Sequence, residues 1–164
     1  MDRELELKFR ITNPQEVRER LGRLGARRIS AGLECNAIFD DAGRTLLARG
    51  CGLRVRSVCS LDAPGDPSRG TLTYKGPIEG GTVKSRPEIE TAVSDPDATI
   101  RLLEALGFSR VITFEKRRES WQLDACHVEI DELPQLGSFV EIEGPDEAQI
   151  RAAQSRLNLR AAAI

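Results

Sequence analysis

The chain alternates ionisable and apolar residues over much of its length, and this pattern constrains its fold more than any other feature. Within residues 3–11 the two kinds strictly alternate: Glu4, Glu6 and Lys8 interleave with Leu5, Leu7 and Phe9. Because successive side chains of a β-strand point to opposite faces, such a segment forms a strand with one charged and one apolar face. Comparable segments follow at residues 27–40, 51–60, 70–77, 84–93, 109–122, 126–132 and 138–144. We therefore predict about eight strands.

Three other segments carry helix signals. Asn13-Pro14 and Asp95-Pro96 each combine an N-cap residue with proline at the first helical position, and Gly25 and Gly107 are plausible C-terminal stops. A third helix is expected from about residue 146 to residue 157. Together with the strands, these helices predict an α+β fold with about three flanking helices, in one domain that covers residues 1–164.

The first two helices belong to units that look related. A constant shift of 82 positions brings Asn13-Pro14 onto Asp95-Pro96, Gly25 onto Gly107 and Glu6 onto Glu88. Residues 3–40 and 85–122 are therefore predicted to form a strand-helix-strand pseudo-repeat. The alternative is that helix-capping rules alone produce the coincidence.

The charged faces of the strands allow two interpretations. An antiparallel sheet with one solvated face explains the alternation. It does not explain why nearly every strand carries two or more ionisable residues at alternate positions, with acidic pairs on the terminal strands and basic pairs between them. This choice of residues favours a closed eight-stranded antiparallel β-barrel with the charged faces inward. Charges buried in this way need partners, since an isolated buried charge is very costly.

A polyanion that carries its own divalent cation would partner both sets of charges. Mg²⁺ and Mn²⁺ prefer oxygen ligands, and the acidic positions supply them: Glu4, Glu6, Asp131, Glu141 and Glu143. Arginine matches phosphate oxygens with its planar fork, while lysine acts as a point charge. The residues themselves thus point to a metal-bound polyanion inside the barrel.

Composition argues against several other classes of protein. A formal net charge of −2 is unlike that of a protein that coats nucleic acid. No apolar run approaches the roughly 20 residues that span a membrane, and the charged start has no signal-peptide core. We expect a cytoplasmic protein with no nucleic-acid or membrane partner. A single histidine, His127, and four cysteines without CxxC spacing argue against a histidine-based metal site or a structural zinc site.

Several short motifs, taken in order, resemble those of the CYTH family, the triphosphate tunnel metalloenzymes. The family includes class IV adenylyl cyclases, thiamine triphosphatases and inorganic tripolyphosphatases. Glu4-Leu-Glu6-Leu-Lys8 resembles its opening ExExK signature. The other matches, in chain order, are residues 36–40 to N-x-Y-F-D, 53–56 to LRxR, 72–77 to LTxKGP, 86–90 to RxExE, 116–118 to KxR, and 129–132 with 136–143 to the closing block. This ordered combination covers about residues 3–144.

The resemblance implies an eight-stranded tunnel and a role for each matched residue. The implied metal ligands, for Mg²⁺ or Mn²⁺, are Glu4, Glu6, Asp131, Glu141 and Glu143. The implied substrate-binding residues are Lys8, Arg54, Arg56, Lys75, Arg86, Lys116 and Arg118. The implied catalytic residues are Glu4, Glu6, Lys8 and Glu143. Glu88 and Glu90 either orient basic residues or add to the acidic set.

Two departures from the family's pattern affect substrate preference more than phosphate binding. Ile38 stands where the family usually has tyrosine, and the late lysine of some triphosphatases has no clear counterpart, with Arg160 as the candidate substitute. The oligomeric state is left open, with a homodimer among the options.

The expected function is metal-dependent processing of a small-molecule triphosphate. The leading hypothesis is hydrolysis of tripolyphosphate or another organic triphosphate. A class IV adenylyl cyclase would hold ATP in the same tunnel, where the ribose 3′ oxygen attacks the α-phosphorus and pyrophosphate leaves. A non-catalytic polyphosphate-binding module is the second alternative.

Overall fold

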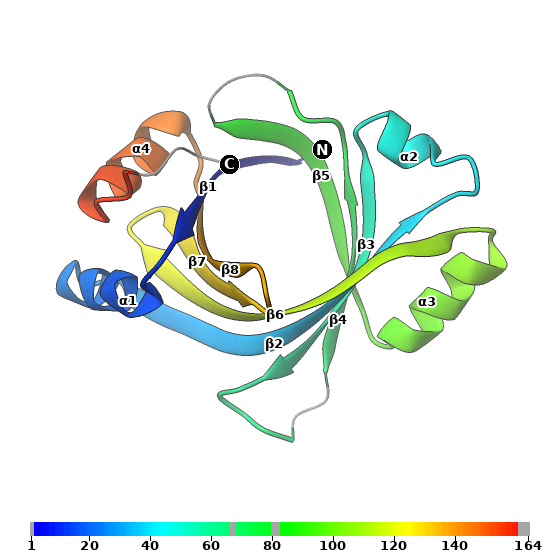
Figure 1. The fold of residues 1–164 in the computed structure, drawn as a ribbon, viewed down its shortest axis with the longest axis horizontal. Helices are drawn as coiled ribbons and strands as arrows, with labels where there is room; N and C mark the ends of the chain where they lie inside the picture. The colour runs from blue at the N-terminus through cyan, green and yellow to red at the C-terminus, as the bar shows by residue number, and fades with distance from the viewer. Residues whose placement is uncertain (1, 66–67, 80–82, 161–164) are drawn as a thin grey trace.

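Eight antiparallel strands close into a barrel in the computed structural model, which describes residues 2–65, 68–79 and 83–160 (Figure 1). The strands are β1 (Asp2–Ile11), β2 (Arg27–Asp40), β3 (Gly52–Ser60), β4 (Arg69–Lys75), β5 (Lys84–Val93), β6 (Ser109–Leu123), β7 (Cys126–Leu133) and β8 (Gly137–Glu143). Their order around the barrel is β1-β5-β4-β3-β2-β6-β7-β8, and β8 pairs with β1 to close the ring. The predicted α+β fold with a closed eight-stranded barrel is confirmed.

In the described part of the chain, four helices lie outside the ring of strands (Figure 1): α1 (Pro14–Arg23), α2 (Thr45–Ala48), α3 (Pro96–Ala105) and α4 (Glu147–Arg156). The caps predicted for the first two helix-bearing units are present, since Asn13 accepts a hydrogen bond from the Glu16 amide and Asp95 accepts one from the Ala98 amide. Asp146 caps α4 in the same way through the Gln149 amide. Each cap satisfies a backbone N–H that the helix itself leaves without a partner.

The expectation of about three helices missed α2. This helix has only four residues, too few for a hydrophobic period to be visible in the sequence. Asp40 holds it in place by accepting hydrogen bonds from the amides of Leu46 and Leu47. The acidic residue that ends the N-x-Y-F-D-like segment therefore has a structural role here.

The two predicted repeat units have the same local plan. One runs β1-α1-β2 and the other β5-α3-β6, and their equivalent strands are direct neighbours in the barrel, β1 beside β5 and β2 beside β6. This arrangement is what a duplicated unit would give, although the duplication itself stays a prediction.

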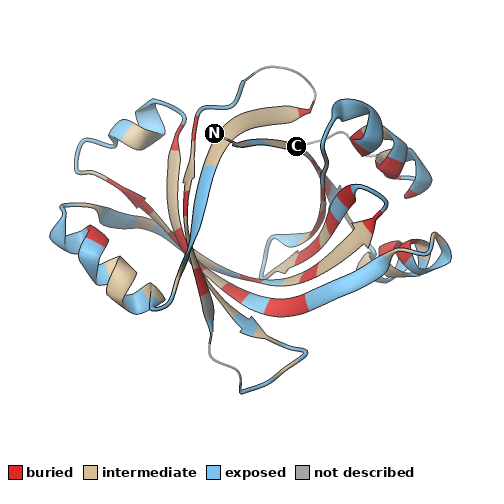
Figure 2. Cartoon of the chain, turned by 180° about the vertical axis from the view of Figure 1, so that it is seen from behind, coloured by how far each residue is buried: buried red, intermediate tan, exposed pale blue. Residues whose placement is uncertain are grey.

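The apolar faces of the strands form the core outside the barrel lumen, against the helices. The larger cluster joins the outer faces of β1, β7 and β8 to α1 and α4, with Leu7, Leu21, Ile142 and Ile150 at 1% exposure or less. A smaller cluster joins β2 and β3 to α3 around Phe39. Figure 2 shows buried stretches on α4 and on the strands beside it. Burying one large apolar side chain contributes about 1.5–3 kcal/mol to stability. Because this hydrophobic core lies outside the ring of strands, the lumen is left available for charged groups.

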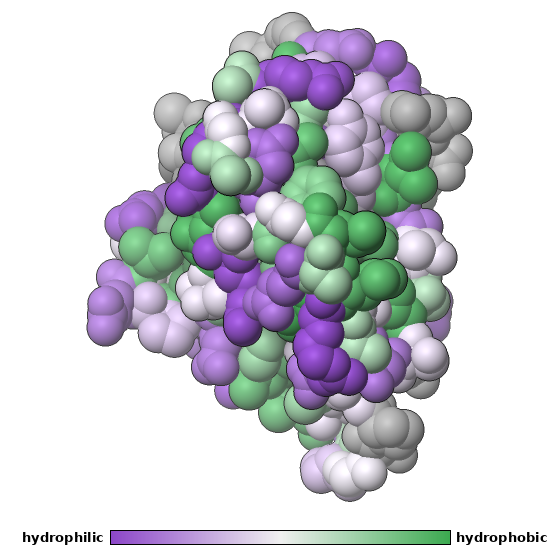
Figure 3. Space-filling view, turned by 90° about the vertical axis from the view of Figure 1, so that its right-hand side faces the viewer, coloured by the Kyte–Doolittle hydropathy of each residue, from purple (hydrophilic) through white to green (hydrophobic). Residues whose placement is uncertain are grey.

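The exposed surface carries scattered apolar residues. Leu47 of α2 and Leu102 of α3 are 70% and 59% exposed, and Figure 3, which shows that side of the molecule, has hydrophobic patches interspersed with hydrophilic ones. None of the helices in the described ranges is both long and apolar enough to cross a membrane.

Candidate active site

The lumen of the barrel contains a cavity of about 550 Å³ that is lined mainly by charged side chains. Every residue that the sequence assigned to the site lines this cavity: Glu4, Glu6, Lys8, Arg54, Arg56, Lys75, Arg86, Lys116, Arg118, Asp131, Glu141 and Glu143. Strand geometry explains this result, since residues two apart on one strand point to the same face. The individual roles of these residues stay predictions.

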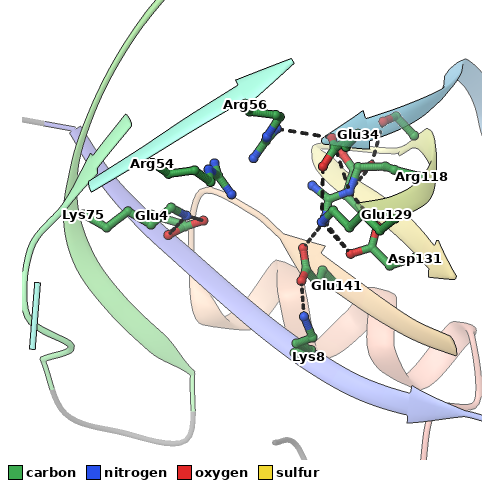
Figure 4. A network of polar contacts seen from close by, with 12 residues as sticks. Glu4, Lys8, Glu34, Arg54, Arg56, Lys75, Arg118, Glu129, Asp131 and Glu141 are labelled. Carbon is green, nitrogen blue, oxygen red and sulfur yellow. Dashed lines mark hydrogen bonds and ion pairs between the residues drawn. The ribbon is translucent and has the colours of Figure 1, made fainter. Parts of the chain in front are cut away.

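One set of ion pairs joins β1, β6, β7 and β8 (Figure 4). Arg118 is bidentate on Asp131, with Nε 2.6 Å from Oδ1 and Nη2 2.6 Å from Oδ2, and it also donates to Glu141. Lys116 Nζ lies 2.8 Å from Asp131 Oδ2, and Lys8 Nζ lies 2.6 Å from Glu141 Oε1. Two predicted metal ligands, Asp131 and Glu141, thus hold cations that are predicted to bind phosphate.

These pairs shift the pKa values of their members. Burial raises the pKa of Glu141, but the charges of Arg118, Lys116 and Lys8 outweigh it, so that the pKa lies well below its usual range. Burial and the charge of Arg118 lower the pKa of Lys116, against the opposing charges of Glu141 and Asp131. The lowered pKa of Glu141 favours its ionised form, which pairs with Lys8 and Arg118.

A second set of ion pairs joins β1, β4 and β5. Lys75 Nζ lies 2.7 Å and 2.8 Å from the two oxygens of Glu4 and 2.8 Å from Glu88 Oε2. Arg86 Nε lies 3.1 Å from Glu4 Oε2. Burial raises the pKa of Glu4, but Lys75 and Arg86 outweigh it and the net shift is downward. Glu88 thus pairs with a basic residue, and which of the two roles left open by the sequence it has stays a prediction.

Arg54 and Arg56 of β3 are held less firmly than the other cations. Arg54 Nη2 is 3.9 Å from Glu90 Oε2, and Arg56 Nη1 is 3.4 Å from Glu34 Oε1. The Nε atoms of both guanidinium groups are buried without a hydrogen-bond partner among the described residues. Burial and the neighbouring charge of Arg56 lower the pKa of Arg54 to about 10. Buried donors of this kind have unused capacity for an anion.

Glu6 and Glu143 complement these arginines, because they are two carboxylates of the same cavity. They are directly opposite each other in the β1–β8 pair, and neither carboxylate makes a hydrogen bond or an ion pair with another described residue. Burial raises the pKa of Glu6, and the charges of Glu141 and Glu4 raise it further. Burial and the charges of Glu4 and Glu88 likewise raise the pKa of Glu143. Two facing carboxylates without a cation partner fit a divalent cation.

The five predicted metal ligands are not gathered into one ready-made site. Within the described ranges, no group of three or more acidic, histidine or cysteine side chains converges closely enough to hold an ion. Glu4, Asp131 and Glu141 are turned toward Lys and Arg instead. A metal ion that uses these carboxylates would have to replace the cations that now pair with them.

The cavity also has lining residues that the sequence assignment omitted. They include Lys84, Phe114, Glu129 and Leu133. The alternation of side chains along a strand already indicates that they face the lumen. Phe114 is two residues before Lys116, and Glu129 and Leu133 flank Asp131 at the same spacing. Phe114, Leu133 and Ile38 give part of the cavity an apolar wall.

Comparisons with known proteins match this architecture. A Methanocaldococcus jannaschii protein named "putative adenylate cyclase" is 29% identical over 140 residues, which are 85% of this chain and 75% of that protein. The PH1819 protein of Pyrococcus horikoshii is 27% identical, with a TM-score of 0.77 over 94% of this chain and 86% of that one.

Two further solved structures share the fold at lower identity. The PH1012 protein of Pyrococcus horikoshii has a TM-score of 0.81 at 24% identity, over 98% of this chain and 94% of that one. A Hippeastrum protein, HpAC1, whose structure is described as revealing a dominant triphosphatase activity, has a TM-score of 0.70 at 17% identity, over 95% of this chain and 88% of that one.

The model of the CYTH domain family matches residues 2–159, which is nearly the whole chain. The charged barrel, its ordered motifs and this match lead to one conclusion: the chain belongs to the CYTH domain family.

Proposed function

We propose that this chain is a divalent-metal-dependent enzyme that hydrolyses tripolyphosphate or an organic triphosphate inside the barrel. The observation that carries the proposal is that one cavity contains both an acidic pair without a cation partner, Glu6 and Glu143, and a basic pair with unused donors, Arg54 and Arg56. A metal-bound triphosphate has the complementary charges for both pairs.

Substrate binding would exchange the partners of the existing ion pairs. Phosphate oxygens would take over Lys8, Lys116 and Arg118, which now pair with Glu141 and Asp131. The same exchange would free Glu4 from Lys75 and Arg86. The carboxylates released in this way, together with Glu6 and Glu143, would hold Mg²⁺ or Mn²⁺. This exchange keeps the lumen close to neutral, which avoids the cost of isolated buried charges.

The bound metal would supply Lewis-acid polarisation of phosphoryl oxygens and favour ionisation of an attacking water. The chain's own residues would position the reaction. Arg54 and Arg56 would hold the phosphate chain along β3, and Lys8 would stabilise charge that develops on the transferring group. Glu6 and Glu143, whose pKa values are raised, would orient the water and accept its proton. Hydrolysis then breaks the phosphoanhydride bond and releases orthophosphate.

An adenylyl cyclase is the second candidate, and two observations favour it. The Methanocaldococcus jannaschii relative is named as a putative adenylate cyclase, and Ile38, Phe114 and Leu133 provide an apolar wall in the cavity that a nucleobase could contact. In this case the 3′ oxygen of ATP would attack the α-phosphorus and pyrophosphate would leave. A non-catalytic polyphosphate-binding module ranks last, because Glu6 and Glu143 would then have no evident purpose.

Product analysis separates these candidates. The purified protein is incubated with tripolyphosphate, thiamine triphosphate or ATP, each with Mg²⁺ or Mn²⁺, and orthophosphate, pyrophosphate and cyclic AMP are measured. Release of orthophosphate that stops on addition of a chelator is the expected result. Cyclic AMP formed together with pyrophosphate would show that the protein is a cyclase and not a hydrolase. Tight polyphosphate binding without turnover would favour the binding module.

A further inference from the structure

A buried carboxylate outside the predicted set lies behind the cations of the tunnel. Glu34 of β2 is 3% exposed and does not line the cavity, whereas the cations beside it do. Glu34 Oε1 is 3.4 Å from Arg56 Nη1 and 3.9 Å from Arg118 Nε, and Oε2 is 3.5 Å from Lys116 Nζ (Figure 4). Three cations therefore separate this carboxylate from the space that a ligand would fill.

The contacts of Glu34 are looser than those of the acids that line the cavity. Asp131 receives hydrogen bonds of 2.6–2.8 Å from Lys116 and Arg118. The contacts of Glu34 are 3.4–3.9 Å long, and its Oε2 is buried without a hydrogen-bond partner among the described residues. Glu34 thus contributes negative charge without taking the Nε–H of Arg56, which has no hydrogen-bond partner among the described residues.

That charge offsets repulsion among the cations. Burial and the charge of Arg56 lower the pKa of Arg54, the charge of Arg118 lowers it further, and Glu34 and Glu90 oppose the shift. Like charges repel strongly in a medium of low dielectric. When no anionic ligand is bound, Glu34 is therefore one of the groups that hold the cations of β3 and β6 together.

We propose that Glu34 is a built-in counter-ion of the phosphate-binding cations, which stabilises the tunnel in its empty state and lowers its affinity for polyanions. This inference rests on the proposed function, because it takes these cations to be the phosphate-binding groups. Asp131 and Glu141 line the cavity and can pass to a metal, but Glu34 stays with the cations throughout. A triphosphate must share Arg56, Lys116 and Arg118 with it, which also helps the anionic products to leave.

A counter-ion role for Glu34 predicts opposite changes in stability and in affinity for polyanions when its charge is removed, which a purely structural role would not. Removing the charge of Glu34 leaves buried cations without compensation, which destabilises the empty protein. A bound polyanion replaces the missing charge, so the liganded protein is destabilised less. By linkage, the affinity for polyanions must then rise while the stability of the empty protein falls.

The test compares Glu34→Gln with wild type by calorimetric titration of tripolyphosphate in the presence of a chelator, so that no metal-dependent turnover occurs. We expect the dissociation constant to fall about tenfold. Without anions the thermal midpoint of the variant should lie below that of wild type. Saturating tripolyphosphate should raise the midpoint of the variant by more than it raises the midpoint of wild type. If Glu34→Gln does not fold alone, its recovery on refolding with tripolyphosphate supports the proposal, and failure to recover contradicts it.

Two control variants isolate the effect of charge at this position. Glu34→Asp keeps the charge and should bind tripolyphosphate within about threefold of wild type. Glu119→Gln removes a charge from a glutamate of β6 that is equally buried, at 6% exposure, but pairs with Arg18 of α1 outside the lumen. It should lower stability and leave the dissociation constant unchanged.

The outcomes also separate this inference from the proposed function. Wild-type protein that binds tripolyphosphate, together with a Glu34→Gln variant that binds it equally or more weakly, would overturn only the counter-ion role. Wild-type protein that binds tripolyphosphate neither in the chelator nor with Mg²⁺ would overturn the proposed function as well.

Discussion

Glu6 and Glu143 face each other across the β1–β8 pair, inside a cavity rich in lysine and arginine, yet neither carboxylate is paired with a cation among the described residues. The nearby lysines and arginines are engaged by Glu4, Glu88, Asp131 and Glu141. Burial and neighbouring carboxylates raise the pKa values of both groups, so a cation bound between them would relieve an unfavourable negative charge.

Replacing Glu143 by glutamine should abolish metal-dependent turnover, with kcat/KM at least about 100-fold lower. The variant removes a carboxylate whose pKa is raised by burial and by the charges of Glu4 and Glu88, so its metal-free form should be as stable as wild type or more stable in thermal unfolding. Glu115→Gln, on an exposed position of β6, is the matched control and should leave both quantities unchanged. Unchanged turnover in Glu143→Gln would remove this residue from the proposed site.

The acidic residues predict a particular pH dependence of stability for the metal-free protein. The pKa values of Glu6, Glu129 and Glu143 are raised in the fold above the usual 4.5, so their protonation stabilises the folded state. That contribution is lost as the pH rises through the raised values. The pKa values of Glu4 and Glu141 are lowered, and their stabilising contribution is lost as the pH falls below 4.5 through the lowered values.

The free energy of unfolding should therefore pass through a maximum at weakly acidic pH. Urea denaturation in a chelator, repeated across the acidic and neutral range, measures it. The double variant Glu6→Gln with Glu143→Gln should flatten the decline on the neutral side, and excess Mg²⁺ should do the same for wild type. A wild-type curve that keeps rising from weakly acidic to neutral pH would contradict the assignment.

Replacing Arg54 by alanine should mainly weaken substrate binding. Its side chain lines the cavity, and its Nε atom has no hydrogen-bond partner in the described part of the chain. A charge-assisted hydrogen bond to phosphate is worth about 1.5–3 kcal/mol. We expect KM for the preferred triphosphate to rise roughly 10-fold to 100-fold, measured by steady-state kinetics. Arg110→Ala, which removes an exposed arginine that pairs with Glu104, is the control. A variant with unaltered KM and kcat would show that Arg54 does not contact the substrate.

The outer core should determine stability independently of the lumen. Ile142 is fully buried on the helix-facing side of β8, and Ile142→Ala should cost about 2–5 kcal/mol of unfolding free energy by urea denaturation. Leu102→Ala, on an exposed face of α3, should change it by less than about 1 kcal/mol. Equal effects of the two substitutions would contradict the described core.

The sequence was sufficient to predict the barrel and the inward-facing residues, because strand periodicity determines which side chains share a face. It could not predict how those side chains pair. Asp131 looks like a metal ligand by its residue type and motif position, but only the β6–β7 register places Arg118 opposite to it. Glu34 was missed for a different reason: it lies on the same face as Asn36 and Ile38 but precedes the matched motif. The alternation of side chains along β2 would have been enough to identify Glu34 as facing the lumen.

The position of β1 in the ring has a consequence for how the protein is made. Among the described strands, β1 pairs with β5 and β8 alone. Lys8 therefore has no partner until Glu141, 133 residues later, has been synthesised. Pairings between such distant segments form slowly, and domains synthesised on ribosomes emerge from the N-terminus first. β1 therefore leaves the ribosome before the other strands of the barrel but is among the last of them to be fixed in the sheet. A nascent chain gains its complete set of site residues only when Glu143 has been added.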